Sequence, residues 1–166
     1  LAEMKLILLS SLAPTTKILQ ETDIDMMDSL WVGKGFVAHY NGNNKKIDRF
    51  NSEKGLFTGL GSSTYRNAII ENVHIHSGKV AGGENHIAGI VSAPSFGIIR
   101  NCINRADIIN TLIEGSIANN TAGIAGNSGT SAIGLTITNC VNYGKIVGNT
   151  FTAGIVANVQ GVHISG

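Results

Sequence analysis

Most of this sequence consists of short, isoleucine-rich apolar runs that glycine or asparagine interrupts every few residues. Eighteen of the 22 isoleucines lie within residues 55–166. β-Branched side chains favour strands, and Gly and Asn favour the tight turns between them. Because Gly and Asn recur so often, the pattern also argues against long helices. We therefore expect an all-β chain of short strands.

A phrase in which glycine precedes Leu or Ile recurs four times and predicts a structural repeat. Its glycines are spaced 34, 34 and 31 residues apart, at Gly55, Gly89, Gly123 and Gly154. Two other phrases lie between these copies in constant order, at residues 70–73, 99–104 and 137–142, and at residues 78–80, 106–108 and 144–146. Three phrases per period of about 30 residues predict a parallel β-solenoid, whose passes stack about 4.8 Å apart.

Stacking predicts ladders of identical side chains. Asparagine recurs at one position of the repeat, so we expect a structural amide ladder through Asn72, Asn101 and Asn139, and a shorter one through Asn104 and Asn142. Cys102 and Cys140 share a second position, which Val73 occupies in the preceding pass. We expect two buried free thiols there, while a disulfide or a metal site stays open.

These phrases resemble the GLUG-type repeats of bacterial and protist surface proteins, which occur in large adhesins and in non-catalytic regions of surface proteases. The resemblance is carried by the Gly-[Leu/Ile]-x-[Gly/Ala/Ser] and Ile-x-Asn-Cys-x-Asn phrases and by the lead-in segment 35–47, and it covers roughly residues 30–166. Ser92 and Ala157 depart from the second glycine of the motif. The resemblance implies a right-handed parallel β-helix at a cell surface, and it implies no active site.

Charge divides the chain into two parts. Residues 1–54 carry seven basic and seven acidic side chains, whereas residues 55–166 carry five and four. We expect residues 1–30 to form a less regular N-terminal cap or lead-in segment, and residues 31–166 to form a β-helix repeat domain of about four turns. Residues 160–166 begin another isoleucine-bearing phrase, so we expect the solenoid to be truncated at its C-terminus.

Composition excludes several classes of protein. A net charge of +1 is too balanced for a nucleic-acid partner, and 43% hydrophobic residues are too many for a disordered chain. No apolar run reaches the roughly 18 residues of a membrane span. The resemblance implies an extracellular or cell-surface location.

Two groups of residues invite a metal hypothesis, although we assign no metal site to either. His74 and His76 alternate on one strand face, with Glu84 and His86 a few residues on. The alternative is a partly buried or solvent-facing pair of rings. A second group, Asp23, Asp25 and Asp28, lacks the glycine turn of a calcium loop and suits a solvated edge.

Catalysis finds little support, so we expect no enzyme, catalytic residue or cofactor. Carbohydrate-cleaving sites need paired carboxylates, and the repeat region has four acids: Glu71, Glu84, Asp107 and Glu114. We expect a structural or adhesive stalk whose partners are a host or neighbouring cell surface, a glycan, or copies of itself. The alternatives are a self-assembling filament and a glycan-binding or glycan-cleaving face using Tyr40, Phe57, Tyr65, Phe96, Tyr143 or Phe151.

Overall fold

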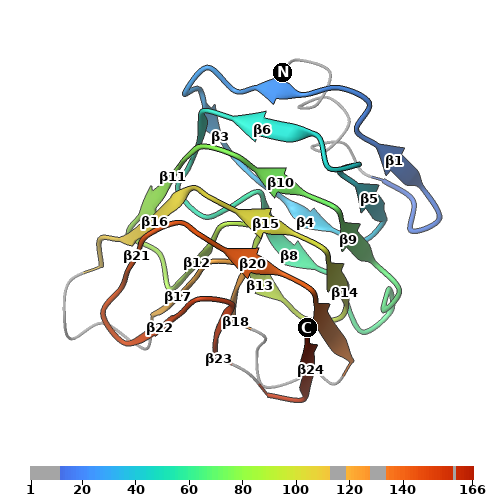
Figure 1. The fold of residues 1–166 in the computed structure, drawn as a ribbon. Coiled ribbons are helices and arrows are strands. Elements are labelled where there is room, and N and C mark those ends of the chain that lie inside the picture. Colours follow the sequence, from blue (N-terminus) through green and yellow to red (C-terminus); the bar gives the residue numbers. More distant parts are fainter. Residues whose placement is uncertain (1–11, 113–118, 128–133, 159) are drawn as a thin grey trace.

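The computed structural model describes residues 12–112, 119–127, 134–158 and 160–166, and these residues form 24 short strands and no helix. Every strand pairing among them is parallel (Figure 1). No helix able to cross a membrane occurs in this part of the chain. The structure is therefore all-β with the strand arrangement of a parallel solenoid.

The strands form five sheets, which the chain visits in a fixed rotation. Sheet A contains β1 (Lys17–Leu19), β5 (His39–Asn41), β9 (Ile69–Glu71), β14 (Gly97–Arg100), β19 (Leu135–Thr138) and β24 (Val162–Ser165). Sheet B contains β2 (Ile24–Asp25), β6 (Lys46–Asp48), β10 (His74–Ile75), β15 (Ile103–Asn104) and β20 (Val141–Asn142). Sheet C contains β3 (Leu30–Trp31), β7 (Phe50–Ser52), β11 (Gly78–Gly82), β16 (Asp107–Asn110) and β21 (Ile146–Val147).

Two further sheets complete each pass before the chain returns to sheet A. Sheet D contains β4 (Gly35–Phe36), β8 (Phe57–Leu60), β13 (Val91–Pro94), β18 (Ala125–Asn127) and β23 (Val156–Asn158). Sheet E contains β12 (His86–Ala88), β17 (Asn120–Ala122) and β22 (Phe151–Ala153), and it precedes sheet D in the later passes. Because consecutive passes supply adjacent strands, Figure 1 shows each sheet running through the sequence colours in order.

The strand register confirms the alignment of the sequence phrases. Ile99 pairs with Ile70 on one side and with Ile137 on the other. In sheet E, Ala88 pairs with Ala122, which pairs with Ala153. Like side chains therefore stack on like side chains, which lets each position keep one orientation in every pass.

The core is a set of columns of inward side chains. In sheet A the inner strands each point an apolar side chain inward, and Tyr40, Ile70, Ile99 and Ile137 are at most 2% exposed. The flanking residues point outward, as the two-residue period of a strand requires. Burying one such aliphatic side chain contributes about 1.5–3 kcal/mol, so a single pass is too small to be stable without its neighbours.

The described part of the predicted N-terminal segment contributes strands to the sheets. Residues 17–31 supply β1, β2 and β3, which pair with β5, β6 and β7. Residues 1–11 lie outside the described residues. The boundary at residue 30 therefore stays a sequence-based prediction.

The repeated glycines make room for asparagine side chains inside the solenoid. A Cβ on Gly89 would lie 2.6 Å from Asn104 Cγ, and a Cβ on Gly123 would lie 2.3 Å from Asn142 Cγ. Asn104 is fully buried, and its Nδ2 donates to Asn142 Oδ1 (2.8 Å) and to the Ala106 carbonyl (2.9 Å). Glycine and asparagine therefore recur together because the two positions face each other.

Substitution of these glycines tests the packing. We expect Gly123→Ala to lower the free energy of unfolding by about 1–3 kcal/mol, since its methyl group would overlap Asn142 and the Gly154 carbonyl. Gly154→Ala is the matched control, because a Cβ there meets nothing within 4 Å. Urea denaturation that gave both variants the same stability would contradict this packing.

Candidate functional site

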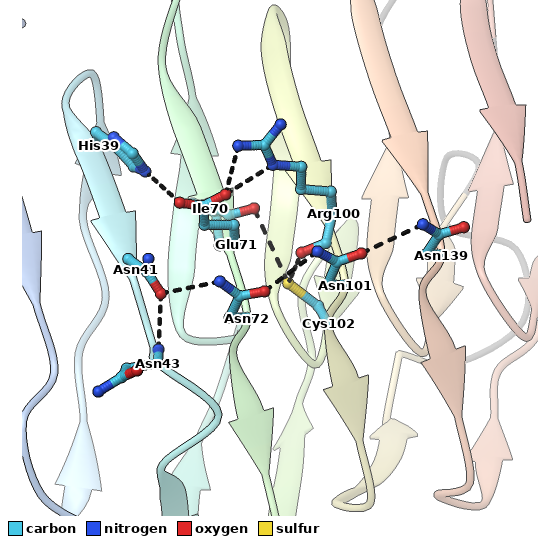
Figure 2. Close-up of polar contacts among 10 residues, drawn as sticks. All are labelled: His39, Asn41, Asn43, Ile70, Glu71, Asn72, Arg100, Asn101, Cys102 and Asn139. Atoms are coloured by element: carbon cyan, nitrogen blue, oxygen red, sulfur yellow. Dashed lines mark hydrogen bonds and ion pairs between the residues drawn. The ribbon is translucent and has the colours of Figure 1, made fainter.

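The strands of sheet A end in a ladder of stacked asparagines (Figure 2). Asn101 Nδ2 donates to Asn72 Oδ1 over 3.2 Å, and Asn139 Nδ2 donates to Asn101 Oδ1 over 3.3 Å. All three have left-handed backbones, with φ of 54°, 54° and 51°. Asparagine tolerates this conformation better than most residues, and its amide both donates and accepts. The structure thus brings together the three asparagines that the sequence predicts as a ladder.

The ladder begins at Asn41, a residue that sequence reasoning missed. Asn72 Nδ2 donates to Asn41 Oδ1 over 3.0 Å, and the same oxygen accepts the Asn43 backbone N–H at 2.8 Å. Here the chain turns through Asn43 and Asn44, both with positive φ, and Lys45 N–H closes the turn on the Gly42 carbonyl. Because this turn is longer, the sequence around Asn41 does not align with the repeated phrase that contains Asn72, Asn101 and Asn139. The Asn-Gly turn at Asn41 is the sequence signal that could have revealed its place in the ladder.

Beside the asparagine ladder lies a charged rung centred on Glu71 (Figure 2). Its Oε1 accepts from His39 Nε2 at 2.7 Å, and its Oε2 accepts from Arg100 Nε at 2.7 Å. Glu71 is 7% exposed. Burial raises the pKa of this carboxyl, but the hydrogen bonds from His39 and Arg100 outweigh that effect and hold the pKa below its usual value. Both partners of Glu71 are basic, whereas glycoside hydrolysis pairs two carboxylates.

The two cysteines stack in successive passes with their thiols free. Val141 N–H donates to the Cys102 carbonyl at 2.9 Å, and Ile103 N–H donates to the Val73 carbonyl at 2.8 Å, so these residues share one column. Burial raises the pKa of the fully buried Cys102, and a thiol hydrogen bond from Cys102 lowers the pKa of the less buried Cys140. We therefore expect Cys140 to be the more reactive sulfur.

The candidate metal ligands are held apart by other partners. Asn120 Nδ2 and Asn127 Nδ2 contact the His86 ring nitrogens at 2.9 and 3.3 Å, and Glu84 pairs with Lys54 at 3.1 Å. His86 and Glu84 thus do not join His74 and His76. Among the described residues, no three His, Cys, Asp or Glu side chains gather as a metal site.

The acidic group near the N-terminus is occupied by chain contacts. Asp23 Oδ1 accepts the Lys46 N–H at 2.8 Å. Asp25 pairs with Arg49 and also accepts from the Met27 N–H, which together lower the pKa of its carboxyl. These carboxylates therefore serve to link neighbouring passes.

Half of the candidate sugar-stacking aromatics lie in the core. Tyr40, Phe57 and Phe96 are 2%, 1% and 7% exposed, and Phe36 packs against the first two. The exposed rings, Tyr65, Tyr143 and Phe151, belong to the segment before β9, the segment after β20, and β22. The exposed rings therefore do not form a single row.

The asparagine ladder can be tested at its middle member. We expect Asn101→Gly to lower the free energy of unfolding by about 1–2 kcal/mol, through loss of two amide hydrogen bonds. Asn101→Ala should cost about 1 kcal/mol more, because alanine also resists the left-handed backbone. Equal effects in urea denaturation would show that the backbone conformation contributes nothing.

The charged rung makes stability depend on acid pH. The folded-state pKa of Glu71 lies below the unfolded value near 4.5, so its contribution is present above pH 4.5 and is lost as pH falls through the folded pKa. Glu71→Gln should cost about 2 kcal/mol at pH 7 and flatten the loss below pH 4.5. Glu84→Gln, in the exposed pair with Lys54, should cost less than about 0.5 kcal/mol. If Glu71→Gln lost stability below pH 4.5 as steeply as the wild type, Glu71 would not be the source of the acid sensitivity.

The thiols differ in burial, and alkylation can detect the difference. Under native conditions iodoacetamide should modify Cys140 first, and Cys102 only on unfolding, because Cys102 is fully buried. Peptide mass spectrometry identifies the modified residue. Preferential native labelling of Cys102 would contradict the structure.

Comparison with known proteins gives no family assignment. The chain matches no protein-family model, and neither the curated proteins nor the solved structures contain a significant match. The resemblance to GLUG-type repeats thus stays a hypothesis that rests on the sequence phrases alone. Function has to be argued from the geometry of the chain itself.

Proposed function

We propose that this chain is a structural and adhesive stalk segment of a larger cell-surface or secreted repeat protein. In this proposal the sheets wind as a right-handed β-helix of about four turns after a short N-terminal cap. The observation that carries it is that adjacent passes are joined throughout by the same kinds of contact. These contacts are the backbone pairs, the asparagine ladder and the charged rung. A repeated interface of this kind gives a stiff element that can be lengthened by adding repeats.

The side-chain chemistry is consistent with a non-enzymatic role. The asparagine ladder is engaged in amide–amide bonds, and Glu71 is held by His39 and Arg100. Groups that are fixed to each other in this way stabilise a scaffold, whereas catalytic groups must reach a substrate. We therefore propose that the chain is not an enzyme.

Self-association is a second candidate, favoured by the placement of apolar side chains. The exposed large apolar residues among those described fall mainly in or next to the first and last strands of the sheets: Leu19, Met27, Leu30, Val32, Val141, Tyr143, Val147, Phe151 and Ile164. Sedimentation at several protein concentrations tests this candidate, which predicts species larger than monomer.

Surface labelling tests the stalk proposal. Antibodies against the folded chain should label intact, non-permeabilised cells of the source organism, and mild protease treatment of those cells should remove the signal. Antibodies against a cytosolic protein serve as the control. Labelling that required permeabilisation would overturn the cell-surface assignment.

A further inference from the structure

The corner between sheets A and B brings the two cysteines of the chain one rung apart. Cys102 and Cys140 each follow an asparagine of the ladder, and the next residues, Ile103 and Val141, are register partners. The Val141 N–H donates to the Cys102 carbonyl, so the backbone ladder continues through this corner. Neighbouring passes are about 4.8 Å apart, which lies within the range of roughly 4.4–6.8 Å between Cα atoms that a disulfide spans.

The two cysteine side chains have the same orientation. Cys102 Sγ lies 3.2 Å from the carbonyl oxygen two residues before it and 3.9 Å from the Ile70 carbonyl oxygen of the preceding pass (Figure 2). Cys140 Sγ repeats both contacts one pass later, at 3.3 Å and at 3.8 Å from the Ile99 carbonyl oxygen. The two thiols also share a hydrogen bond. Rotation about the Cα–Cβ bonds therefore turns each sulfur toward the other.

We propose that Cys102 and Cys140 close into a disulfide that joins two successive passes when the folded chain meets a small disulfide such as oxidised glutathione. The Cys140 thiolate first attacks one sulfur of the small disulfide, and the other sulfur leaves as a thiolate. Cys102 Sγ then attacks Cys140 Sγ and releases the second small thiol. Two protein thiols are oxidised, one small disulfide is reduced, and the two protein protons end on the two small thiols.

Burial decides which sulfur reacts first. Cys102 is fully buried, whereas Cys140 is partly exposed, so a small disulfide in solvent reaches Cys140. The hydrogen bond from Cys102 lowers the pKa of Cys140, which favours its thiolate. Burial raises the pKa of Cys102, which suits the role of the second sulfur because it reacts only with the neighbour that it already contacts.

The same asymmetry makes the closed disulfide resist reduction. A reducing thiol in solvent reaches only the sulfur of Cys140, and its attack must expel Cys102 as a thiolate. Because burial raises the pKa of Cys102, that thiolate is a poor leaving group. We therefore expect the bond to persist in the folded chain once it has formed.

A bond between passes adds a covalent link to a scaffold that is otherwise held by hydrogen bonds and packing. It closes a loop that contains a complete pass, which restricts the unfolded chain and so stabilises the folded one. The chemistry goes beyond the stalk proposal and does not depend on it, because a cell-surface location would decide only where the oxidant is met.

The experiment incubates the reduced, folded chain with oxidised glutathione and follows intact mass and the peptide map without reductant. The product should be lighter than the reduced chain by two hydrogen atoms, and the peptides of Cys102 and Cys140 should be linked. Its Tm should be about 5–10 °C higher than that of the reduced chain. Glutathione should reduce it about tenfold or more slowly in the folded chain than in urea.

Two valine variants are matched controls, because Val73 already fills this column in the preceding pass and is fully buried. Cys102→Val should stop at a mixed disulfide between Cys140 and glutathione, with no rise in Tm from a link between passes. Cys140→Val should not react while it is folded, because its remaining thiol is buried. Both variants should keep the cooperative unfolding of the reduced wild type.

Three results would overturn the proposal. The wild-type chain could keep both thiols, it could stop at a mixed disulfide as Cys102→Val does, or it could form disulfide-linked dimers through Cys140 in place of the internal bond. Each can be read from the intact mass without any assumption about the cell. Surface labelling of cells is independent of these measurements, so failure of the disulfide can be distinguished from failure of the stalk proposal.

Discussion

The whole structure depends on one constraint, which is that each pass of the chain must place its strands in parallel register with those of the pass before. Ile70, Ile99 and Ile137 illustrate the consequence, because the same inward position is refilled by the same residue type. No pass has a core of its own, since its buried side chains contact their counterparts in the neighbouring passes. A substitution in one strand therefore changes the packing of the neighbouring passes as well.

The corners between sheets obey the same constraint through different chemistry. An asparagine with positive φ turns the chain after sheet A, and its amide bonds to the asparagine of the adjacent pass. Inside the solenoid, Gly89 and Gly123 leave space for Asn104 and Asn142. The recurrence of glycine and asparagine therefore reflects backbone and packing needs, which explains why the repeat is easy to see and says little about a ligand.

Sequence reasoning succeeds where a residue recurs and fails where a pairing joins unlike residues. The period and the shared positions of Asn72, Asn101 and Asn139 follow from repetition alone. The Glu71–Arg100 pair does not, because a carboxylate and a guanidinium in successive passes meet only once the register is known. The place of Asn41 in the ladder could not be predicted, because its phrase departs from the repeat in length and composition.

Methyl NMR of protein labelled at its isoleucine and valine methyl groups tests the stacking most directly. The account predicts nuclear Overhauser contacts between Ile99 and both Ile70 and Ile137, because these side chains stack in one buried column of sheet A. Further contacts should join Ile108 to Val80 and to Ile146 in sheet C. Contacts of Ile99 only with residues close in sequence would contradict parallel in-register stacking, and with it the stalk that we propose.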